Sequence, residues 1–228
     1  MSFLQIATHN IGTGGTAAGL RKWDVLLAVN GEIFTEDSRA LYLKFQNRTD
    51  APWLLTIKRQ DLVVDVLIDT PFVADFVNTD DETTITAQEV INKHRFLNLS
   101  DYRNFEVYRD KFKNADLVDT RKNPFAGLFA PVWMLHNRLY LLLFLVITIY
   151  FTAYFAHVFL LLITALLIGI YTQRAQINLK RAYCDILEKK LWMVVASNNE
   201  ISVVEKIIAA DEETSVRHFI PKSRRIKT

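Results

Sequence analysis

The feature that most constrains this chain is an unbroken apolar segment, residues 139–173, which holds 35 residues and no Lys, Arg, Asp or Glu. Arg138 precedes the segment and Arg174 follows it. Buried helices of soluble domains usually show a polar face or end sooner, so a run of this length predicts a segment that enters a lipid bilayer.

This segment is too long for one upright helix, which would measure roughly 50 Å against a hydrocarbon layer of about 30 Å. Its least apolar part lies between Thr152 and His157. A turn there leaves two spans of about 16–18 residues, at the short end of what can cross. We therefore predict a helical transmembrane hairpin; one long tilted span and a re-entrant pair that never crosses are the alternatives.

The flanks of the apolar segment are basic on both sides, while the expected turn carries only His157. Positive residues stay on the cytoplasmic side of a membrane, so a two-span hairpin places both termini in the cytoplasm. Four of these flanking residues are expected at the membrane interface: Arg138, Arg174, Lys180 and Arg181.

The start of the chain and its cysteine content agree with a cytoplasmic N-terminal domain. Residues 1–7 lack the basic start of a signal peptide, so we expect the first membrane entry at the internal apolar segment. The single cysteine, Cys184, excludes an internal disulfide and suits a reducing compartment.

The first seventy residues indicate a small β-rich domain, and five of the seven glycines lie within the first 31 positions. Residues 3–7 alternate as a strand does, and residues 24–29 form a strand that leads into Asn30-Gly31, the dipeptide that most favours a type I′ turn. A helix from about 38 to 45 and a hairpin around Gln60-Asp61 complete the domain.

Residues 17–31 read AAGLRKWDVLLAVNG and resemble the central motif of PDZ domains of the bacterial protease-associated type, A-x-x-A-G-L-x-x-G-D-V-I-L-x-V-N-G. The following helix and hairpin, which ends in I-x-R at Ile57 and Arg59, lie where that family has them. The resemblance covers about residues 3–70 and implies a PDZ-like fold with a groove in which an extended peptide adds to a sheet edge.

Two departures from the family pattern affect this expectation. Trp23 replaces the family's glycine, so we expect the tight turn there to be rearranged. The backbone N–H groups that hold a peptide's terminal carboxylate lie, in the family, before the segment that matches residues 3–7, so we expect this cradle to be missing. The helical wall of the groove remains, and its candidate partner-binding residues are Leu41, Tyr42 and Phe45.

A linker with a short helix, residues 74–103, follows the PDZ-like domain, residues 1–73. Its acidic part has neither the alternating ligand spacing nor the closing Glu of a calcium loop. Thr86 and Glu89 form a capping box that predicts a helix to about Phe96.

Residues 104–138 are expected to form a short β-hairpin, turning near Lys113-Asn114, and then an apolar interfacial or re-entrant segment with Trp133 at headgroup level. FEVYRD at 105–110 and the pattern F-x-x-x-F-x-P-x-W at 125–133 resemble a family of small bacterial inner-membrane proteins of unknown function. This resemblance covers residues 104–178 and implies a bacterial origin and a hairpin membrane unit, residues 139–173.

The remainder, residues 174–228, is expected to form cytoplasmic helices and a basic tail. Residues 177–210 favour helix, with a break at 197–200. The last twelve residues carry five Lys or Arg and no acid, which is typical of a solvated end or of a segment attracted to an anionic surface. The candidate contacts to such a surface are Arg224, Arg225 and Lys227.

No pattern in the chain indicates catalysis. The five histidines are scattered singly, the glycine-rich residues 12–17 lack the long helix of a dinucleotide site, and there is no P-loop or cysteine pair. We therefore expect an α+β protein without catalytic, cofactor-binding or metal-binding residues and without nucleic acid as a partner.

Three functional interpretations remain open. The preferred one is a non-catalytic, membrane-anchored adaptor or accessory subunit of a larger bacterial inner-membrane assembly, with lipids and other membrane-protein subunits as partners. The alternatives are a PDZ-type, peptide-binding regulator of a membrane protease, and a membrane-organising protein that binds anionic lipid.

Overall fold

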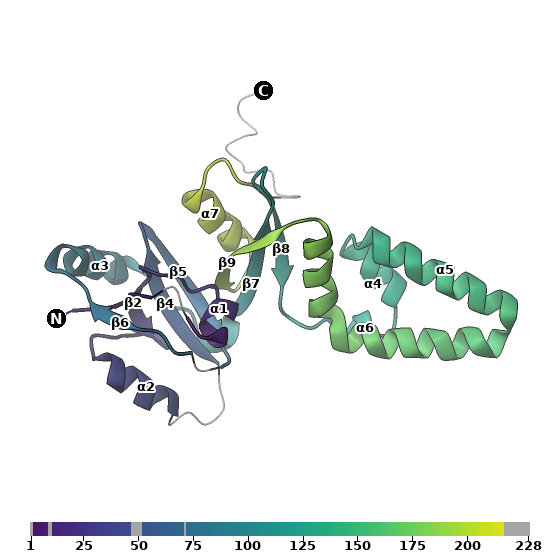
Figure 1. Cartoon of the computed structure of the whole chain (residues 1–228), viewed down its shortest axis with the longest axis horizontal. Helices are drawn as coiled ribbons and strands as arrows, with labels where there is room; N and C mark the ends of the chain where they lie inside the picture. Colours follow the sequence, from purple (N-terminus) through teal and green to yellow (C-terminus); the bar gives the residue numbers. More distant parts are fainter. Residues whose placement is uncertain (1, 9–10, 47–51, 71, 217–228) are drawn as a thin grey trace. The chain divides into compact units, whose positions relative to one another are not determined.

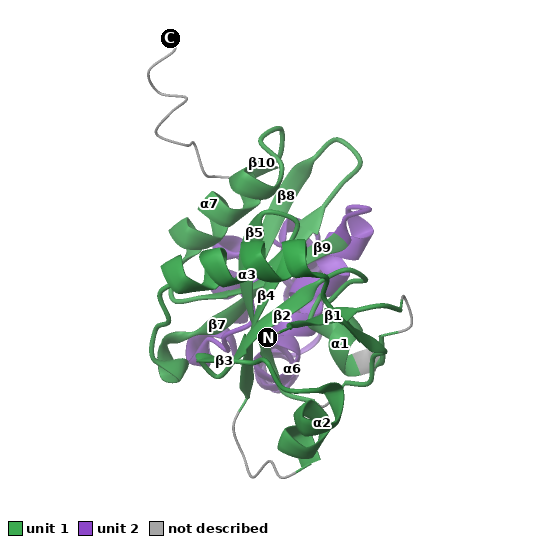
Figure 2. Cartoon of the chain, turned by 90° about the vertical axis from the view of Figure 1, so that its left-hand side faces the viewer, with its two compact units in different colours: residues 1–117, 191–228 green, residues 118–190 purple. Residues whose placement is uncertain are grey.

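The structure is a computed structural model that describes the whole chain except residues 1, 9–10, 47–51, 71 and 217–228. The chain divides into two compact units (Figure 2). Unit 1 contains residues 1–117 and 191–228, and unit 2 contains residues 118–190. The described residues form an α+β protein with two sheets and seven α-helices, as the sequence predicts at the level of fold class.

The first sheet of unit 1 has six strands in the order β5-β4-β2-β1-β6, and β3 pairs with β2. Their bounds are β1 Leu4–Ile6, β2 Val25–Val29, β3 Glu32–Ile33, β4 Trp53–Arg59, β5 Leu62–Ile68 and β6 Phe76–Asn78 (Figure 1). All neighbours in this sheet run antiparallel.

The two turns predicted in this sheet are confirmed. Asn30 and Gly31 have φ of 52° and 84° between β2 and β3, the left-handed pair that a type I′ turn requires. Gln60, with φ of 55°, begins the turn of the β4–β5 hairpin. In β5, Val64, Val66 and Ile68 all enter the core, because alternate residues of a strand share a face.

Three helices accompany the first sheet: α1 Thr13–Ala17, α2 Ser38–Gln46 and α3 Asp81–Lys93. The short helix α1 is formed by the glycine-rich residues that follow β1. Helix α3 begins five residues before the predicted capping box, because the Asp80 carboxylate accepts a hydrogen bond from the Thr83 amide and caps the helix earlier. Its Ala87 and Ile91 pack on β2 residues such as Leu27.

The second sheet of unit 1 has the order β10-β8-β7-β9. It comprises β7 Arg103–Arg109, β8 Asn114–Asp119, β9 Lys190–Ser197 and β10 Ser215–Val216, with the 3-10 helix η1 at Leu99–Asp101 and helix α7 at Glu200–Ala210. The predicted hairpin of β7 and β8 is confirmed, with its turn at Lys113 in a left-handed conformation of φ 65°.

The prediction that residues 190–197 are helical is wrong, because they form β9. Leu191–Ala196 is a short apolar run, and such a run fits a buried strand as well as a helix. In the structure Met193, Val194 and Val195 are all buried, and the main core cluster joins them to Phe105 and Val107 of β7. Tertiary packing therefore decides in favour of a strand.

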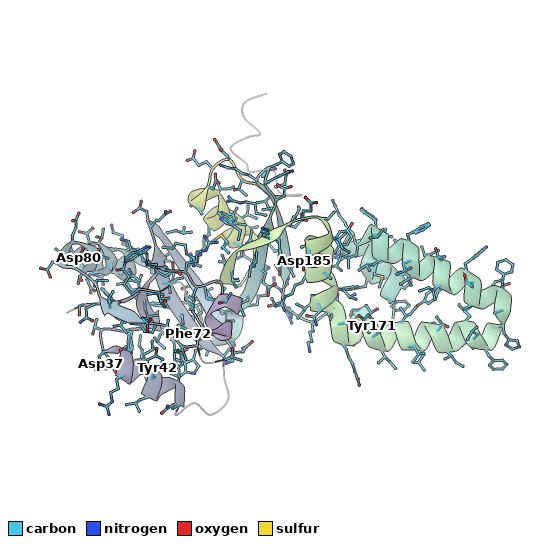
Figure 3. All side chains as sticks on the ribbon, in the orientation of Figure 1. Asp37, Tyr42, Phe72, Asp80, Tyr171 and Asp185 are labelled. Atoms are coloured by element: carbon cyan, nitrogen blue, oxygen red, sulfur yellow. The ribbon has the colours of Figure 1, made fainter. Side chains whose placement is uncertain are left out.

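Unit 2 contains the 3-10 helix η2 Pro124–Ala126 and the helices α4 Ala130–His136, α5 Tyr140–Ala156 and α6 Val158–Ile186. Helices α5 and α6 meet at His157, so the predicted turn is confirmed. The His157 ring accepts a hydrogen bond from the Phe159 amide and caps α6. Side chains project outward along both helices (Figure 3).

The two helices are not the two equal spans that the sequence predicts. In the described part of the chain only α6, with 29 residues, is long and apolar enough to cross a membrane. Helix α5 is also apolar, but its 17 residues make it shorter than a typical membrane-spanning helix. Helix α6 also continues beyond Gln173, the predicted end of the apolar segment, because the following residues favour helix as strongly.

The segment around η2 lies directly on α6. The Gln176 side chain is buried, accepts a hydrogen bond from the Asn123 amide at 2.7 Å and donates to the Asn123 carbonyl at 3.4 Å. One turn earlier, the side-chain oxygen Oε1 of Gln173 accepts a hydrogen bond from the Gly127 amide at 3.0 Å. A Cβ built on Gly169 would lie 2.4 Å from the Gly127 carbonyl oxygen, so the two backbones touch only because this residue is glycine.

Candidate functional site

Unit 1 contains a cavity of about 590 Å³ at the junction of its two sheets. Its walls come from three places: the turn before β2, the β4–β5 turn and the second sheet with α7. The charged and aromatic lining residues are Arg21, Lys22, Trp23, Asp24, Arg59, Asp61, Arg109, Trp192 and Asp211. Four of them are basic and three are acidic.

Asp24 and Arg59 form the buried side of this cavity. The Asp24 side chain is 1% exposed, and its two oxygens accept from Arg59 Nε at 2.8 Å and from Arg59 Nη2 at 2.6 Å. The Arg21 amide also donates to Asp24 Oδ2 at 2.8 Å. Charge-assisted bidentate pairs of this kind are strong and fix the planes of both groups, so the charge of Asp24 is paired with that of Arg59.

Arg109 forms the opposite side. Its guanidinium carbon lies 4.1 Å from the centre of the Trp192 ring, and its Nη1 donates to Asp211 Oδ2 at 2.9 Å. Asp211 Oδ2 also forms an ion pair with Lys113 Nζ at 3.1 Å. Hydrogen bonds from Lys113 lower the pKa of Asp211, although desolvation raises it. Arg109 therefore shares its carboxylate with a second cation.

Arg21 stands between these two pairs. Its guanidinium donates to the Trp192 carbonyl oxygen and forms no ion pair with any described carboxylate. Burial lowers the pKa of Arg21, and the positive charges of Arg59 and Arg109 lower it further, while Asp24 acts in the opposite direction. The site therefore has an excess of positive charge at Arg21.

Trp23 lies at the rim of the cavity in an unfavourable conformation. Its φ is 74°, and its side chain is 60% exposed with Lys22 Nζ 4.6 Å from the ring centre. The turn has a left-handed conformation at Trp23, a geometry that glycine adopts without strain. A bulky residue at positive φ costs roughly 1–2 kcal/mol.

The side chains around this cavity are of kinds that commonly contact anions and aromatic rings. Within the described residues no three His, Cys, Asp or Glu side chains lie together in a way that could hold a metal ion. The cavity offers guanidinium and ammonium donors and two indole rings, which are groups suited to recognition.

The predicted peptide groove is occupied by the chain itself. Residues 72–79 run antiparallel to β1: β6 pairs with β1, the Ala7 amide donates to the Asp75 carbonyl, and the Gly12 amide donates to the Val73 carbonyl. The Tyr42 hydroxyl donates to the Ala74 carbonyl at 2.6 Å and accepts from the Ala74 amide at 3.3 Å.

The three candidate partner-binding residues all lie beneath or against this segment. Leu41 and Phe45 are 0% and 4% exposed, and the Phe45 ring packs edge-on against Phe72. Tyr42 and Phe72 are labelled in Figure 3. A partner could reach this wall only after residues 72–79 had moved away.

The predicted membrane-interface residues are all in unit 2. Trp133 is only 5% exposed and packs inside the unit, with Lys180 Nζ 5.7 Å from its ring centre. Arg138 has φ of 57° at the junction of α4 and α5. Arg174 and Arg181 are exposed on α6. The candidate tail residues Arg224, Arg225 and Lys227 lie outside the described residues.

The cavity residues were missed by sequence reasoning because they come from distant positions. Arg21 and Trp192 are 171 residues apart, and only the fold brings them together. Trp23 gave one signal, since it stands where the resemblance calls for glycine.

Comparison with known proteins does not add to this description. No protein-family model, curated protein or solved structure matches the chain.

Proposed function

We propose that this chain is a non-catalytic, membrane-anchored adaptor or accessory subunit of a larger assembly in a bacterial inner membrane. Unit 2 is the anchor, inserted as a helical hairpin with both ends on the cytoplasmic side. Unit 1, a PDZ-like module joined to a second sheet, is the part that meets other subunits.

The observation that carries this proposal is the outward-facing apolar surface of α5 and α6. Only 11% of the most apolar 18-residue stretch of α6 is buried, whereas a core helix of a soluble protein would be mostly buried. The most exposed aromatic side chains of the hairpin are Phe144, Phe151, Phe155 and Phe159, each at least 64% exposed. Such a surface requires lipid or another protein to cover it.

The segment before α5 extends this apolar surface. Five large side chains of η2, α4 and their connection are more than half exposed: Phe125, Leu128, Phe129, Val132 and Leu135. The backbone amides at positions 123 and 127 bond to Gln176 and Gln173, so these two amides of the irregular segment are satisfied, as apolar surroundings require. It is suited to the bilayer interface.

The hairpin is short for a full crossing. Helix α5 spans about 25 Å at 1.5 Å per residue, against a hydrocarbon layer of about 30 Å. Local thinning of the bilayer or neighbouring helices can accommodate this difference. Accommodation by neighbouring helices favours an assembly over an isolated chain, since helices of other subunits would cover the exposed side chains.

The experiment that tests the adaptor proposal is gentle detergent extraction followed by crosslinking and mass spectrometry. We expect one or more membrane proteins to be recovered in a fixed ratio with the chain. A stable monomer in mild detergent, with no crosslinked partner, contradicts an accessory-subunit role.

The peptide-binding alternative requires residues 72–79 to leave the groove. Titration of the full-length protein with libraries of C-terminal peptides tests it. Binding no tighter than millimolar excludes the alternative, whereas tight binding accompanied by loss of the Tyr42–Ala74 contact supports it.

The anionic-lipid alternative depends on the basic tail. Liposome binding of a variant in which Arg224 and Arg225 are replaced by Gln tests it, with neutral liposomes as the control. An unchanged affinity for anionic liposomes counts against a role of the tail in lipid attraction.

A further inference from the structure

We infer that the cavity between residues 21–24 and Trp192 binds a phosphate group, carried by a soluble small molecule or by a lipid headgroup. This inference concerns unit 1 alone and does not depend on the proposed membrane anchoring.

The first argument is the distribution of charge. Asp24 accepts hydrogen bonds from Arg59 and from the Arg21 amide, and Asp211 is shared between Arg109 and Lys113. Within the described residues, neither of these carboxylates, nor Asp61 at the β4–β5 turn, forms an ion pair with the Arg21 guanidinium. Arg21 and Lys22 line the cavity with two positive charges, and no carboxylate in the described part of the chain is paired with either of them.

The second argument is the kind of donor. A guanidinium carries five N–H groups, and the Arg21 side chain uses a single described acceptor, the Trp192 carbonyl. Its remaining donors, with the ammonium of Lys22, match the several oxygens of a phosphate. A dianionic phosphate balances two cations, whereas a single carboxylate balances one.

The third argument is the size of the cavity and the backbone strain at Trp23. A volume of about 590 Å³ exceeds what a phosphate ion needs and lies within the usual range of small-molecule sites. Trp23 adds an exposed indole at the rim and holds a backbone conformation with φ of 74° that glycine would adopt without strain. Strain of this kind is concentrated at functional sites, where the side chain has a use that glycine cannot replace.

A bound anion would also offset the effects that lower the pKa of Arg21. Burial, Arg59 and Arg109 lower the pKa of Arg21, and only Asp24 acts against them. A phosphate in the cavity adds negative charge next to the guanidinium and so stabilises its charged form.

The test uses full-length protein in detergent micelles for the soluble probes and in lipid nanodiscs for the lipid probe. Isothermal titration with inorganic phosphate and with AMP measures the binding of soluble phosphates to the protein. Thermal unfolding of unit 1 in phosphatidylcholine discs, with and without phosphatidylglycerol, measures the lipid arm. We expect saturable binding of AMP or of phosphate, or stabilisation by phosphatidylglycerol, and the responding arm identifies the source of the phosphate.

The matched variants are Arg21→Gln and Arg39→Gln, which remove one arginine from the cavity and one from the surface of α2. We expect Arg21→Gln to weaken the response at least tenfold, Arg39→Gln to leave it unchanged and Arg21→Lys to restore part of it. Equal losses in the two Gln variants overturn the inference, because the effect would then be one of net charge. No response of the wild-type protein in any arm overturns it as well.

Trp23→Gly separates a binding role from a structural one. Because glycine relieves the left-handed backbone strain, the variant should unfold at the same temperature as the wild type or a higher one. We expect it nevertheless to bind AMP more weakly. Wild-type AMP affinity in Trp23→Gly, in a protein that responds to AMP, shows that the indole is not part of the site and overturns its assignment here.

Discussion

At the scale of single residues, unit 1 depends on a small number of buried polar groups that connect elements distant in sequence. Asp65 of β5 is 3% exposed and accepts from Thr56 Oγ1 at 2.8 Å. It also contacts His94 Nε2 at 3.1 Å and Lys206 Nζ at 3.2 Å. A single carboxylate thus links the first sheet to the end of α3 and to α7.

The first prediction concerns the pH dependence that Asp65 confers. Burial raises the pKa of Asp65, but hydrogen bonds from His94 and Thr56 and the charge of Lys206 lower it more, so the net shift is downward. A lowered pKa stabilises the fold fully above the ordinary value of 3.8, and this contribution is lost as the pH falls through the still lower folded-state pKa.

Replacing Asp65 by Asn should therefore cost about 3 kcal/mol of unfolding free energy at pH 7, since Lys206 loses its buried partner. The difference from wild type should shrink in acid below about pH 4. Urea unfolding between pH 7 and pH 3 measures both effects. Asp61→Asn, at an exposed turn position of the same hairpin, is the control and should show neither.

At the scale of elements, the segment 72–79 behaves as an added strand that closes the groove between α2 and β1. Its backbone bonds to Ala7 and Gly12, and its first residue, Phe72, is buried in the core at 2% exposure. Extended peptides that add to a sheet edge are held in the same way, by main-chain hydrogen bonds and by side-chain pockets.

The second prediction is that Tyr42→Phe loosens this segment without unfolding the domain. Loss of the two contacts with Ala74 removes about 1 kcal/mol. The amides of Ala7 and Gly12 should then exchange with solvent about fivefold faster. Hydrogen–deuterium exchange of the full-length protein measures this. Tyr102→Phe, which loses a hydrogen bond to Leu97 away from the groove, should leave both amides unchanged.

A third prediction concerns the contact between η2 and α6. Gly169→Val places methyl groups against the Gly127 carbonyl, from which even a Cβ would be 2.4 Å away. Overpacking of this kind costs typically about 1–3 kcal/mol, so the loop should detach from the helix for a larger share of the time. Cleavage by trypsin after Lys122, which is exposed at the start of the loop, should accelerate about tenfold.

The control for this experiment is Leu166→Val, which introduces the same residue at an exposed position of α6. Equal cleavage of the two variants would show that valine weakens the helix itself and that the glycine contact is unimportant.

At the scale of the whole molecule, the two units differ in the solvent to which they are suited. Unit 1 has a buried apolar core that combines residues of both sheets. Unit 2 has a small core around Trp133, and its large apolar side chains mostly face outward. A soluble protein of this size rarely exposes so continuous an apolar surface, because water makes it unfavourable.

The fourth prediction tests how the hairpin is inserted. A His157→Cys variant that also carries Cys184→Ala should react with a membrane-impermeant maleimide added from the periplasmic side, because the proposed hairpin brings its turn to that surface. A cysteine at Ser2 in the same background should not react until the membrane is opened. Protection of position 157 in intact cells would indicate a re-entrant pair, and release of the protein by carbonate would exclude insertion altogether.

Much of the fold could be predicted from local signals. Asn30-Gly31 determines its turn because both residues accept positive φ, and His157 ends α5 where the apolar run weakens. The helix predicted at 190–197 failed because the apolar run there has no periodicity that separates a helix from a buried strand. The predicted start of α3 was wrong because two capping signals compete, and Asp80 supplies the one that caps the helix.

The candidate site could not be predicted in this way, since its members are separated by up to 171 positions between Arg21 and Trp192. The groove shows the same limit. The wall formed by Leu41, Tyr42 and Phe45 is visible in the sequence, but nothing in the sequence says that residues 72–79 return to cover it.

The sequence alone determined the features that depend on neighbouring residues: the apolar segment that water cannot solvate, the glycine-dependent turns and the strands of the first hairpins. Tertiary structure alone decided what lies against what, including the strand that fills the groove, the strand formed by residues 190–197 and the arginines collected around one cavity. The physical reason is that backbone conformation and hydrophobic periodicity are local properties of the chain, whereas burial and charge pairing depend on residues brought together only by the complete fold.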